Sequence, residues 1–363
     1  MSDFLLRVLR AWMGLPFRVA QLAFPKNRSK AEELVMVQAC KAAERGSDHY
    51  FSFNMRPKSA RSCRCPSGVH YDASDIAVVL QGPLDEADSF TVETARLYSS
   101  LYEDVAIIVS TWKDANPRVV EELDGMGVHV VASDYPENPG YGNINYQLAS
   151  TKAGIDKAMS LGRRYVCKSR TDQRLYAPGA ITYFKDLIDC NPVAEGSGPH
   201  GRIVCLTAEY AGMFTPFYVS DFLYFGKAED MKRLFDLPLR KDHIDLPQNI
   251  TRKQVASCMS CSESYIAYSY ARKIDHACEP TVKDYLDFLA KNMVVVDRAQ
   301  IGFYWHKYDR RYRDHSRHGF HHVGSDPQRY MSVNVNAFQW EEYLTGTMRL
   351  DDSVEAYASE SLA

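Results

Sequence analysis

The chain has 363 residues, and its hydrophobic content of 45% and charged content of 25% are typical of a soluble globular protein with one large or two modest domains. The net charge of −3 excludes a polycation that binds nucleic acid through its overall charge, and we expect no nucleic-acid partner. Nine scattered cysteines, an odd number, argue against a disulfide framework and favour a reducing, cytoplasmic setting.

The first 30 residues combine apolar side chains with positive charge. Six Arg or Lys residues stand against Asp3 alone, and the polar positions between Phe4 and Phe24 share one helical face opposite a wide apolar face. This pattern predicts an amphipathic helix that Pro16 kinks or splits. Its charge-free runs are shorter than the roughly 20 residues that span a bilayer. Two interpretations remain: a helix on the anionic inner membrane surface, or one packed on the domain.

A second helical pattern covers 30–43, and 44–73 is rich in Ser, Arg, Gly and Pro, which is typical of a linker. We therefore expect an N-terminal amphipathic helical extension with a linker (1–73), a catalytic domain (74–340) and an acidic C-terminal tail (341–363).

The body of the chain alternates predicted strands with predicted helices. Short, continuous apolar runs are typical of strands that are buried on both faces of a parallel sheet. Four strand–helix steps of similar size imply right-handed crossovers and a Rossmann-type, mostly parallel α/β sheet flanked by helices. The predicted strands are 76–80, 105–109, 128–131, 165–168, 203–206 and 293–296, and the predicted helices are 89–101, 117–125, 145–161, 181–189, 227–235 and 254–271.

Polar residues follow the strands, and in such a sheet the carboxyl ends of the strands line one crevice where ligands bind. The first strand runs into Gln81, Gly82 and Pro83, a turn that suits the close approach of a nucleotide or is simply tight. The second strand is followed by Thr111 and Trp112. The indole either stacks on a base or sugar or belongs to the core.

The fourth strand ends in one carboxylate and three cations, which are Lys168, Arg170, Asp172 and Arg174. Arginine makes bidentate contacts with phosphate, and a carboxylate can hold Mg²⁺ or Mn²⁺ that bridges a diphosphate. A paired-carboxylate motif would have Asp at position 174. Either Asp172 therefore holds a metal together with a distant ligand, or the arginines neutralise the diphosphate directly. Seen in isolation, the segment is also compatible with a solvated turn.

Three further residues are candidates for the site. Asn145 opens a helix, and helix N-termini attract anions, although the amide could equally serve as a simple cap. Asp221 lies in the aromatic run 217–225, which suits a sugar-binding site or a buried helix cap. Glu263 could be the general base that deprotonates an acceptor hydroxyl, whereas most helical Glu residues are solvated.

The stretch 301–329 interleaves cations with Tyr and Trp. Such a mixture could bind nucleic acid, a lipid phosphate or a diphosphate, or could form a solvated basic loop. His306 could complete a metal site.

In this order, the motifs resemble those of the WavE-type lipopolysaccharide synthesis family of bacterial glycosyltransferases. The matching segments are 79–83, 110–113, 143–151 with Gly154, 168–174, 219–222 with 225–226, and 263–265. The resemblance implies a GT-A-like fold with Asp172 near the place of the metal- and diphosphate-binding carboxylates. Arg174 departs from that pattern, which puts strict metal dependence in question.

The resemblance also implies a function, the transfer of a sugar from a nucleotide-activated donor to a lipopolysaccharide, capsule or other lipid-linked acceptor at the inner membrane face. The donor would be held by Gln81, Gly82, Pro83, Thr111, Trp112, Asn145, Lys168, Arg170 and Arg174, and the catalytic carboxylates would be Asp172, Asp221 and Glu263. Two other functions stay open: a nucleotidyl- or phosphotransferase on a similar fold, and a non-enzymatic module at the membrane surface.

Overall fold

The structure is a computed structural model that describes residues 3–47, 50–63, 68–207, 213–307 and 335–361. It divides into two compact units, Met1–Pro57 and Lys58–Ala363. Most of the basic and aromatic stretch predicted between 301 and 329 lies outside the described residues. The domain limits expected after residues 73 and 340 stay a prediction.

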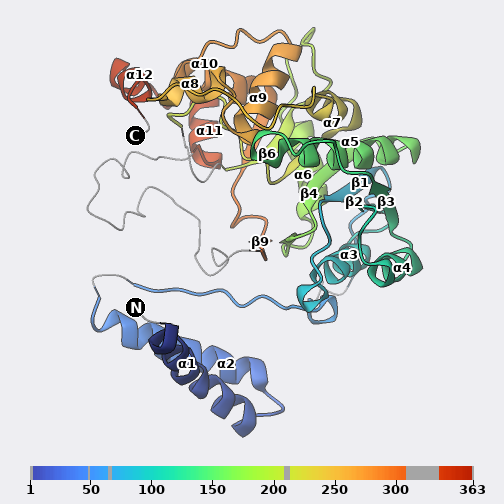
Figure 1. Cartoon of the computed structure of the whole chain (residues 1–363), viewed down its shortest axis with the longest axis vertical. Helices are drawn as coiled ribbons and strands as arrows, with labels where there is room; N and C mark the ends of the chain where they lie inside the picture. Colours follow the sequence, from blue (N-terminus) through green and yellow to red (C-terminus); the bar gives the residue numbers. More distant parts are fainter. Residues whose placement is uncertain (1–2, 48–49, 64–67, 208–212, 308–334, 362–363) are drawn as a thin grey trace. The chain divides into compact units, whose positions relative to one another are not determined.

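The N-terminal unit contains two helices, α1 (Asp3–Ala23) and α2 (Arg28–Glu44), which pack side by side (Figure 1). Helix α1 continues through Pro16, so the predicted split of this helix does not occur. Gln21 donates a hydrogen bond to Glu32 of α2 at 2.6 Å. Among the described residues, no helix is both long enough and apolar enough to cross a membrane.

The second unit is built on a seven-stranded sheet in the order β3-β2-β1-β4-β7-β6-β8. Strands β1 to β4 are parallel to one another, and β7 runs antiparallel to both of its neighbours. This confirms the predicted Rossmann-type, mostly parallel sheet. Its strands are β1 (Ile76–Gln81), β2 (Ala106–Trp112), β3 (His129–Ser133), β4 (Tyr165–Arg170), β6 (Ile203–Leu206), β7 (Tyr224–Lys227) and β8 (Met293–Val296).

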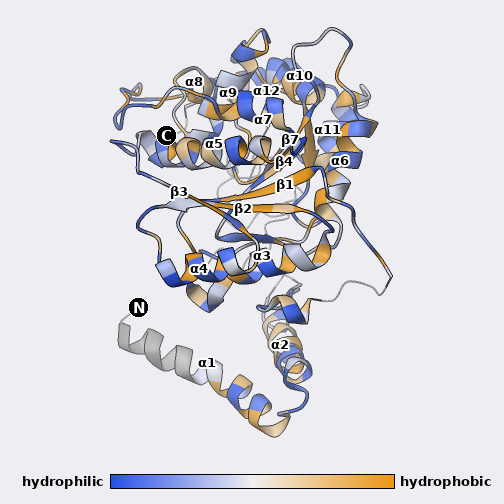
Figure 2. Cartoon of the chain, turned by 90° about the vertical axis from the view of Figure 1, so that its right-hand side faces the viewer, coloured by the Kyte–Doolittle hydropathy of each residue, from blue (hydrophilic) through white to orange (hydrophobic). Residues whose placement is uncertain are grey.

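Every residue of β1 and β2 is buried, which explains why both strands are continuous apolar runs. The sheet lies between helical layers, with α3 (Phe90–Leu101) and α4 (Pro117–Gly125) on one face and α5 (Ile144–Ser160) and α7 (Ala228–Phe235) on the other (Figure 2). Helix α5 crosses β1 and β2 very closely at Gly154, where a Cβ atom would overlap the side chain of Val79. Helix α6 (Ala180–Cys190) packs against β6 and β7.

The single long helix predicted over 254–271 is wrong. The segment forms α8 (Arg252–Ser257) and α9 (Ser262–Lys273), which are separated by Met259 in a left-handed conformation with φ of 49°. Because α9 begins at Ser262, Glu263 lies in its first turn, where the helix dipole favours negative charge. The remaining elements are η1 (Ala60–Ser62), η2 (Ala87–Ser89), η3 (Tyr141–Asn143), α10 (Val282–Asn292), α11 (Ala337–Leu344) and α12 (Asp352–Ala358).

Two short pairings bring distant parts of the chain to the carboxyl edge of the sheet. Because β7 is antiparallel to β4, with Lys168 paired to Tyr224, the segment before β7 arrives where β4 ends. Strand β5 (Gln173–Leu175) continues from β4 and pairs with β9 (Phe303–Trp305) in a second, two-stranded sheet. Residues near 220 and 305 therefore lie close to residues 168–175.

Candidate functional site

The strand order places the candidate site at the ends of β1 and β4. From β1 the chain proceeds outward through β2 and β3, and then returns to β4 on the other side of β1. Such a reversal of strand order is where ligands bind in open α/β sheets. Gln81 at the end of β1 pairs with Arg170 at the end of β4, so the two predicted segments are adjacent.

The turn after β1 is held by hydrogen bonds that use its own main chain. Gly82 has a φ of 118°, which only glycine adopts readily, and its N–H donates to the Ser110 carbonyl at 2.9 Å. The hydroxyl of Thr171 donates to the Pro83 carbonyl. The buried Gln81 side chain accepts a hydrogen bond from Ser150 of α5 at 2.8 Å, so this amide faces the protein interior.

Arg170 and Asp172 form a two-pronged ion pair. Nε and Nη2 of Arg170 donate to Oδ1 and Oδ2 of Asp172 at 3.0 and 3.2 Å. The Arg170 side chain is 24% exposed and the Asp172 side chain is 9% exposed. The guanidinium also lies 5.7 Å from the ring centroid of Trp305. This fork has the geometry with which arginine binds phosphate, so a phosphate group and Asp172 would compete for the same donors.

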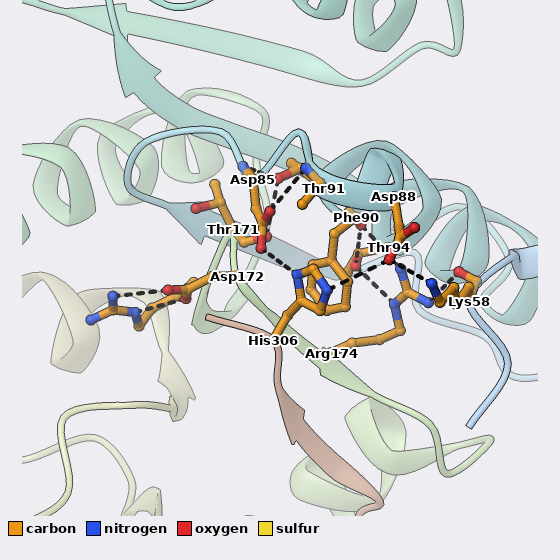
Figure 3. A network of polar contacts seen from close by, with 12 residues as sticks. Lys58, Asp85, Asp88, Phe90, Thr91, Thr94, Thr171, Asp172, Arg174 and His306 are labelled. Carbon is orange, nitrogen blue, oxygen red and sulfur yellow. Dashed lines mark hydrogen bonds and ion pairs between the residues drawn. The ribbon is translucent and has the colours of Figure 1, made fainter. Parts of the chain in front are cut away.

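His306 lies beside Asp172 through its main chain only. Its N–H donates to the Asp172 carbonyl at 2.9 Å, while its Nδ1 lies 2.7 Å from Oδ2 of Asp85 and its ring stacks on Phe90 at 4.5 Å. Figure 3 shows the imidazole and the Asp172 carboxylate pointing in different directions. No group of three or more His, Cys, Asp or Glu side chains in the described part of the chain could hold a metal ion. Asp172 and His306 therefore do not face a common point in the structure, and their role as metal ligands stays a prediction.

Arg174 does not face the site, because protein acceptors occupy its guanidinium (Figure 3). The side chain is fully buried and stacks on Phe90 at 4.3 Å. It donates to the Thr94 hydroxyl at 2.9 Å and to the main-chain carbonyls of Lys58 and Phe90 at 2.8 and 3.1 Å. We therefore correct its expected role: Arg174 ties the segment before β1 to α3 and β5, and it binds no phosphate in this position.

Lys168 is fully buried beneath the site. Its ammonium group donates to the main-chain carbonyl of Asp221, which also accepts a hydrogen bond from Gln147 at 3.3 Å. Burial lowers the pKa of Lys168 to about 7, and the nearby Asp221 carboxylate opposes this effect. Lys168 therefore fixes the main chain at Asp221. Because its ammonium group is fully buried, it could affect a bound ligand through its charge and through the position of Asp221.

Glu263 and Asp221 place two carboxylates in one largely buried region. The Tyr218 hydroxyl donates to Oε1 of Glu263 at 3.1 Å. Burial, followed by the negative charge of Asp221, raises the pKa of Glu263 to about 7. The Asp221 carboxylate receives no hydrogen bond from any described residue, although Lys168 supplies a compensating charge nearby. Glu263 can therefore accept and release a proton near neutral pH.

The aromatic residues at the end of β2 form a stack. Trp112 is buried, with Tyr135 parallel to its ring at 4.4 Å and Tyr146 edge-on at 5.6 Å. Tyr135 is 46% exposed, so Tyr135, and not Trp112, presents the outer ring of the stack. Thr111 is fully buried, and its hydroxyl has no hydrogen-bond partner among the residues that the structure describes.

Asn145 joins two loops and does not cap α5. Its Oδ1 accepts from the Arg240 N–H at 2.7 Å, and its Nδ2 donates to the Arg240 carbonyl at 2.7 Å and to Oδ1 of Asn138 at 2.9 Å. The side chain is fully buried, so no donor remains for a ligand. Asn145 instead holds the loops that precede α5 and follow α7.

Sequence reasoning missed three residues of this region: Tyr218, Tyr135 and Asp85. Tyr218 was one member of an aromatic run, and only its tertiary contact with Glu263 distinguishes it. Tyr135 follows the strand end at Ser133, so its position after a predicted strand was an available signal. Asp85 lies two residues beyond Pro83, and its partner His306 is 221 residues away in the chain.

The fold and the polar edge define a Rossmann-type α/β protein with titratable groups where its central strands end. A profile of the WavE lipopolysaccharide synthesis family matches residues 76–344, and the chain belongs to this family. A comparison with curated proteins found no match.

Solved structures resemble the chain only at low levels. The mannose-1-phosphate geranyltransferase from Thermus thermophilus is 11% identical with a TM-score of 0.25, over 39% of this chain and 44% of that chain, which is less than half its length. The 4-diphosphocytidyl-2C-methyl-D-erythritol synthase from Anaerococcus prevotii is 10% identical with a TM-score of 0.35, over 63% and 89%. A cytidylyltransferase from Leptospira borgpetersenii is 14% identical with a TM-score of 0.26, over 45% and 65%. Similarity at this level says nothing about function.

Proposed function

We propose that the protein is a GT-A-like glycosyltransferase that moves a sugar from a nucleotide-activated donor to a lipopolysaccharide, capsule or other lipid-linked acceptor. Membership of a lipopolysaccharide synthesis family supports this proposal. The observation that carries it is the environment of Glu263, whose carboxylate accepts a hydrogen bond from Tyr218 and whose pKa is raised to about 7 by burial and by the charge of Asp221. A carboxylate of this kind can act as the general base that accepts the proton of an acceptor hydroxyl.

The donor would lie across the ends of β1 and β4. The absence of a side chain at Gly82 lets the main chain approach a nucleotide, and Arg170 offers a bidentate contact to the diphosphate. Binding of the diphosphate would replace Asp172 as the partner of Arg170. The exposed ring of Tyr135 is available for stacking on the base.

In the reaction, Glu263 would take the proton of the acceptor hydroxyl while its oxygen attacks the anomeric carbon of the donor sugar. The bond between that carbon and the phosphate oxygen breaks, and the nucleoside phosphate leaves with the bonding electron pair. Arg170 would stabilise the negative charge that develops on the leaving group. Asp221 keeps Glu263 a stronger base, because a neighbouring negative charge disfavours the ionised carboxylate. A single displacement of this kind inverts the anomeric centre.

We further propose that the N-terminal unit binds the cytoplasmic face of the inner membrane. Trp12, Leu15, Val19 and Leu22 recur at helical spacing along α1 and are 51% to 82% exposed, whereas Gln21 on the opposite side contacts α2. The first 30 residues contain six cations and one acid. An exposed apolar stripe beside basic residues suits an anionic lipid surface, where a lipid-linked acceptor resides.

The reaction is tested by incubating the full chain with a panel of nucleotide sugars and lipid-linked glycans, and by measuring both nucleoside phosphates and pyrophosphate. We expect release of a nucleoside diphosphate or monophosphate, and a loss of roughly 10²- to 10⁴-fold in Glu263→Gln. The matched control is Glu229→Gln in the first turn of α7. Pyrophosphate release would instead identify a nucleotidyltransferase, and full activity of Glu263→Gln would remove the proposed base.

Membrane binding is tested by sedimentation with vesicles of neutral lipid, with and without anionic lipid. We expect binding that requires anionic lipid, weakens as salt rises, and is lost in Leu22→Glu. Leu239→Glu is the control, because Leu239 is similarly exposed but lies in the second unit. Equal binding by wild type and Leu22→Glu would contradict the proposal.

A further inference from the structure

The segment Phe217–Asp221, which precedes β7, is fixed at both ends. Phe217 has a left-handed φ of 55° and is fully buried, with Phe288 at 5.4 Å between ring centroids. At the other end, the Asp221 carbonyl accepts the hydrogen bond from buried Lys168. A non-glycine residue with positive φ costs free energy and persists only where its surroundings enforce it, and such positions concentrate at functional sites.

Tyr218 is the residue of this segment that forms a hydrogen bond with a side chain of α9. Its main-chain carbonyl accepts a hydrogen bond from the Tyr285 hydroxyl at 2.8 Å, which fixes the backbone from which the side chain projects. Its own hydroxyl donates to Oε1 of Glu263 at 3.1 Å. Tyr218 is buried, and burial together with Glu263 raises the pKa of its phenol far above neutral. The phenol therefore stays protonated and remains a donor.

We propose that Tyr218 is a positioning residue for Glu263: its hydroxyl fixes the orientation of the carboxylate that receives the acceptor proton. This inference rests on the proposed function, because it assigns Tyr218 a role only through Glu263. The hydrogen bonds that hold the backbone at Tyr218 and at Asp221 support the assignment, because they fix the position from which the Tyr218 hydroxyl donates to the carboxylate.

The charges that face Glu263 determine the sign of the expected effect. Burial and the Asp221 carboxylate raise the pKa of Glu263, whereas hydrogen bonds from its own backbone N–H, from Tyr218 and from the Cys261 thiol lower it. Tyr224, which lies in the next strand, is protonated and contributes no charge. Removing the Tyr218 hydroxyl should therefore raise the pKa of Glu263, and removing the Asp221 charge should lower it.

The experiment measures the protonation of Glu263 directly in the full chain. Protein labelled with ¹³C at the glutamate side-chain carboxyl is titrated by NMR, and Glu263→Gln identifies the Glu263 signal by its loss. The variants are Tyr218→Phe, Asp221→Asn and Tyr270→Phe. Tyr270 is the matched control, because it lies on the same helix, is buried, and its hydroxyl has no hydrogen-bond partner among the described residues.

We expect the midpoint to rise in Tyr218→Phe, to fall in Asp221→Asn and to stay unchanged in Tyr270→Phe. In the transferase assay, the rate of Tyr218→Phe at pH 6 should fall by about threefold to tenfold and recover as pH rises, with KM unchanged. An unchanged midpoint in Tyr218→Phe would overturn the proposal, as would a loss of activity that is equal at every pH.

The two proposals fail separately. The titration reports contact between Tyr218 and Glu263 without any substrate, whereas full activity of Glu263→Gln would reject the general base. Circular dichroism of each variant confirms that the fold is intact before the midpoints are compared.

Discussion

Lys168 and Glu263 belong to one polar network, and burial acts on them in opposite directions. It lowers the pKa of the ammonium group and raises that of the carboxyl group, because in each case the neutral form is favoured where water is excluded. The negative charge of Asp221 raises the pKa values of both Lys168 and Glu263. Replacing the Asp221 carboxylate should therefore change the pKa values of both Lys168 and Glu263.

The raised pKa of Glu263 predicts a pH-dependent stability. The folded protein binds a proton at Glu263 up to about pH 7, whereas an unfolded chain releases it near pH 4. Stability contributed by this residue therefore falls as pH rises through that interval. We expect Glu263→Gln to raise the unfolding temperature by on the order of 2–4 °C at pH 8 and by much less at pH 5. A gain that is equal at both pH values would contradict this account.

The effect of replacing Asp172 on nucleotide affinity distinguishes two roles, a competitor of phosphate for Arg170 and a metal ligand. In the structure Asp172 forms an ion pair with Arg170, so Asp172→Asn should remove a competitor of the phosphate and tighten binding of a nucleoside diphosphate several-fold without metal. If Asp172 were a metal ligand instead, Mn²⁺ would promote binding to the wild type and the variant would lose that effect. Calorimetric titration with and without Mn²⁺ separates the two results.

Arg174 and Arg170 are the same residue type with opposite expected phenotypes. Arg174→Met removes the hydrogen bond to the Lys58 carbonyl and one of those to the Phe90 carbonyl, so we expect a loss of about 2–3 kcal/mol in the free energy of unfolding. Arg170→Met should change stability little, since the side chain is partly exposed, and should weaken nucleotide binding. Denaturant unfolding and nucleotide titration of both variants test this. A larger loss of stability in Arg170→Met than in Arg174→Met would contradict the assignment.

These two arginines also show that the role of a side chain cannot be predicted from its neighbours in the sequence alone. Both follow the same predicted strand, and nothing in the local pattern separates them. Their roles differ because Arg174 meets Lys58 and Phe90, which lie far away in the chain. Trp112 is a similar case, because its burial depends on Tyr135.

At the scale of the elements, the strands β1 to β4 were predictable, whereas β7 was not. The first four are continuous apolar runs between helices of regular length, a pattern with few other solutions. Aromatic residues occur along the whole segment 217–226, so no change in periodicity marks the beginning of Tyr224–Lys227. The break between α8 and α9 occurs at Met259, which has a left-handed backbone conformation. A helix usually ends in this way at a glycine, and the sequence has methionine here, so the break was not predicted.

The crossing of α5 over the sheet gives a test of the packing between elements. A methyl group at Gly154 would overlap Val79 and lie 3.3 Å from the Ser110 side chain. We expect Gly154→Ala to destabilise the protein by about 1–3 kcal/mol, despite the better helix propensity of alanine. Gly125→Ala in α4 is the control, because nothing lies within 4 Å of its added atom. Equal stabilities of the two variants would show that α5 can move away from the sheet.

At the scale of the whole molecule, the sequence predicted a mostly parallel sheet, a family and a helical N-terminal extension. The sheet is confirmed by the strand order, and the family by the match over residues 76–344. The position of Glu263 relative to Asp221 could not be predicted, because it depends on how α9 and the segment before β7 pack together. The catalytic role of both carboxylates stays a prediction until Glu263→Gln is assayed.

The pairing of β5 with β9 has a consequence for folding during synthesis on the ribosome. Asp172 and Asp85 obtain their partner His306 from a part of the chain that is synthesised much later, 221 residues after Asp85. Chains fold from the N-terminus as they emerge, and contacts between distant residues form late. A nascent chain that has completed β1 to β4 therefore still lacks the strand β9 that borders the proposed donor site. If the proposed site binds a donor, it should do so only after β9 has been synthesised.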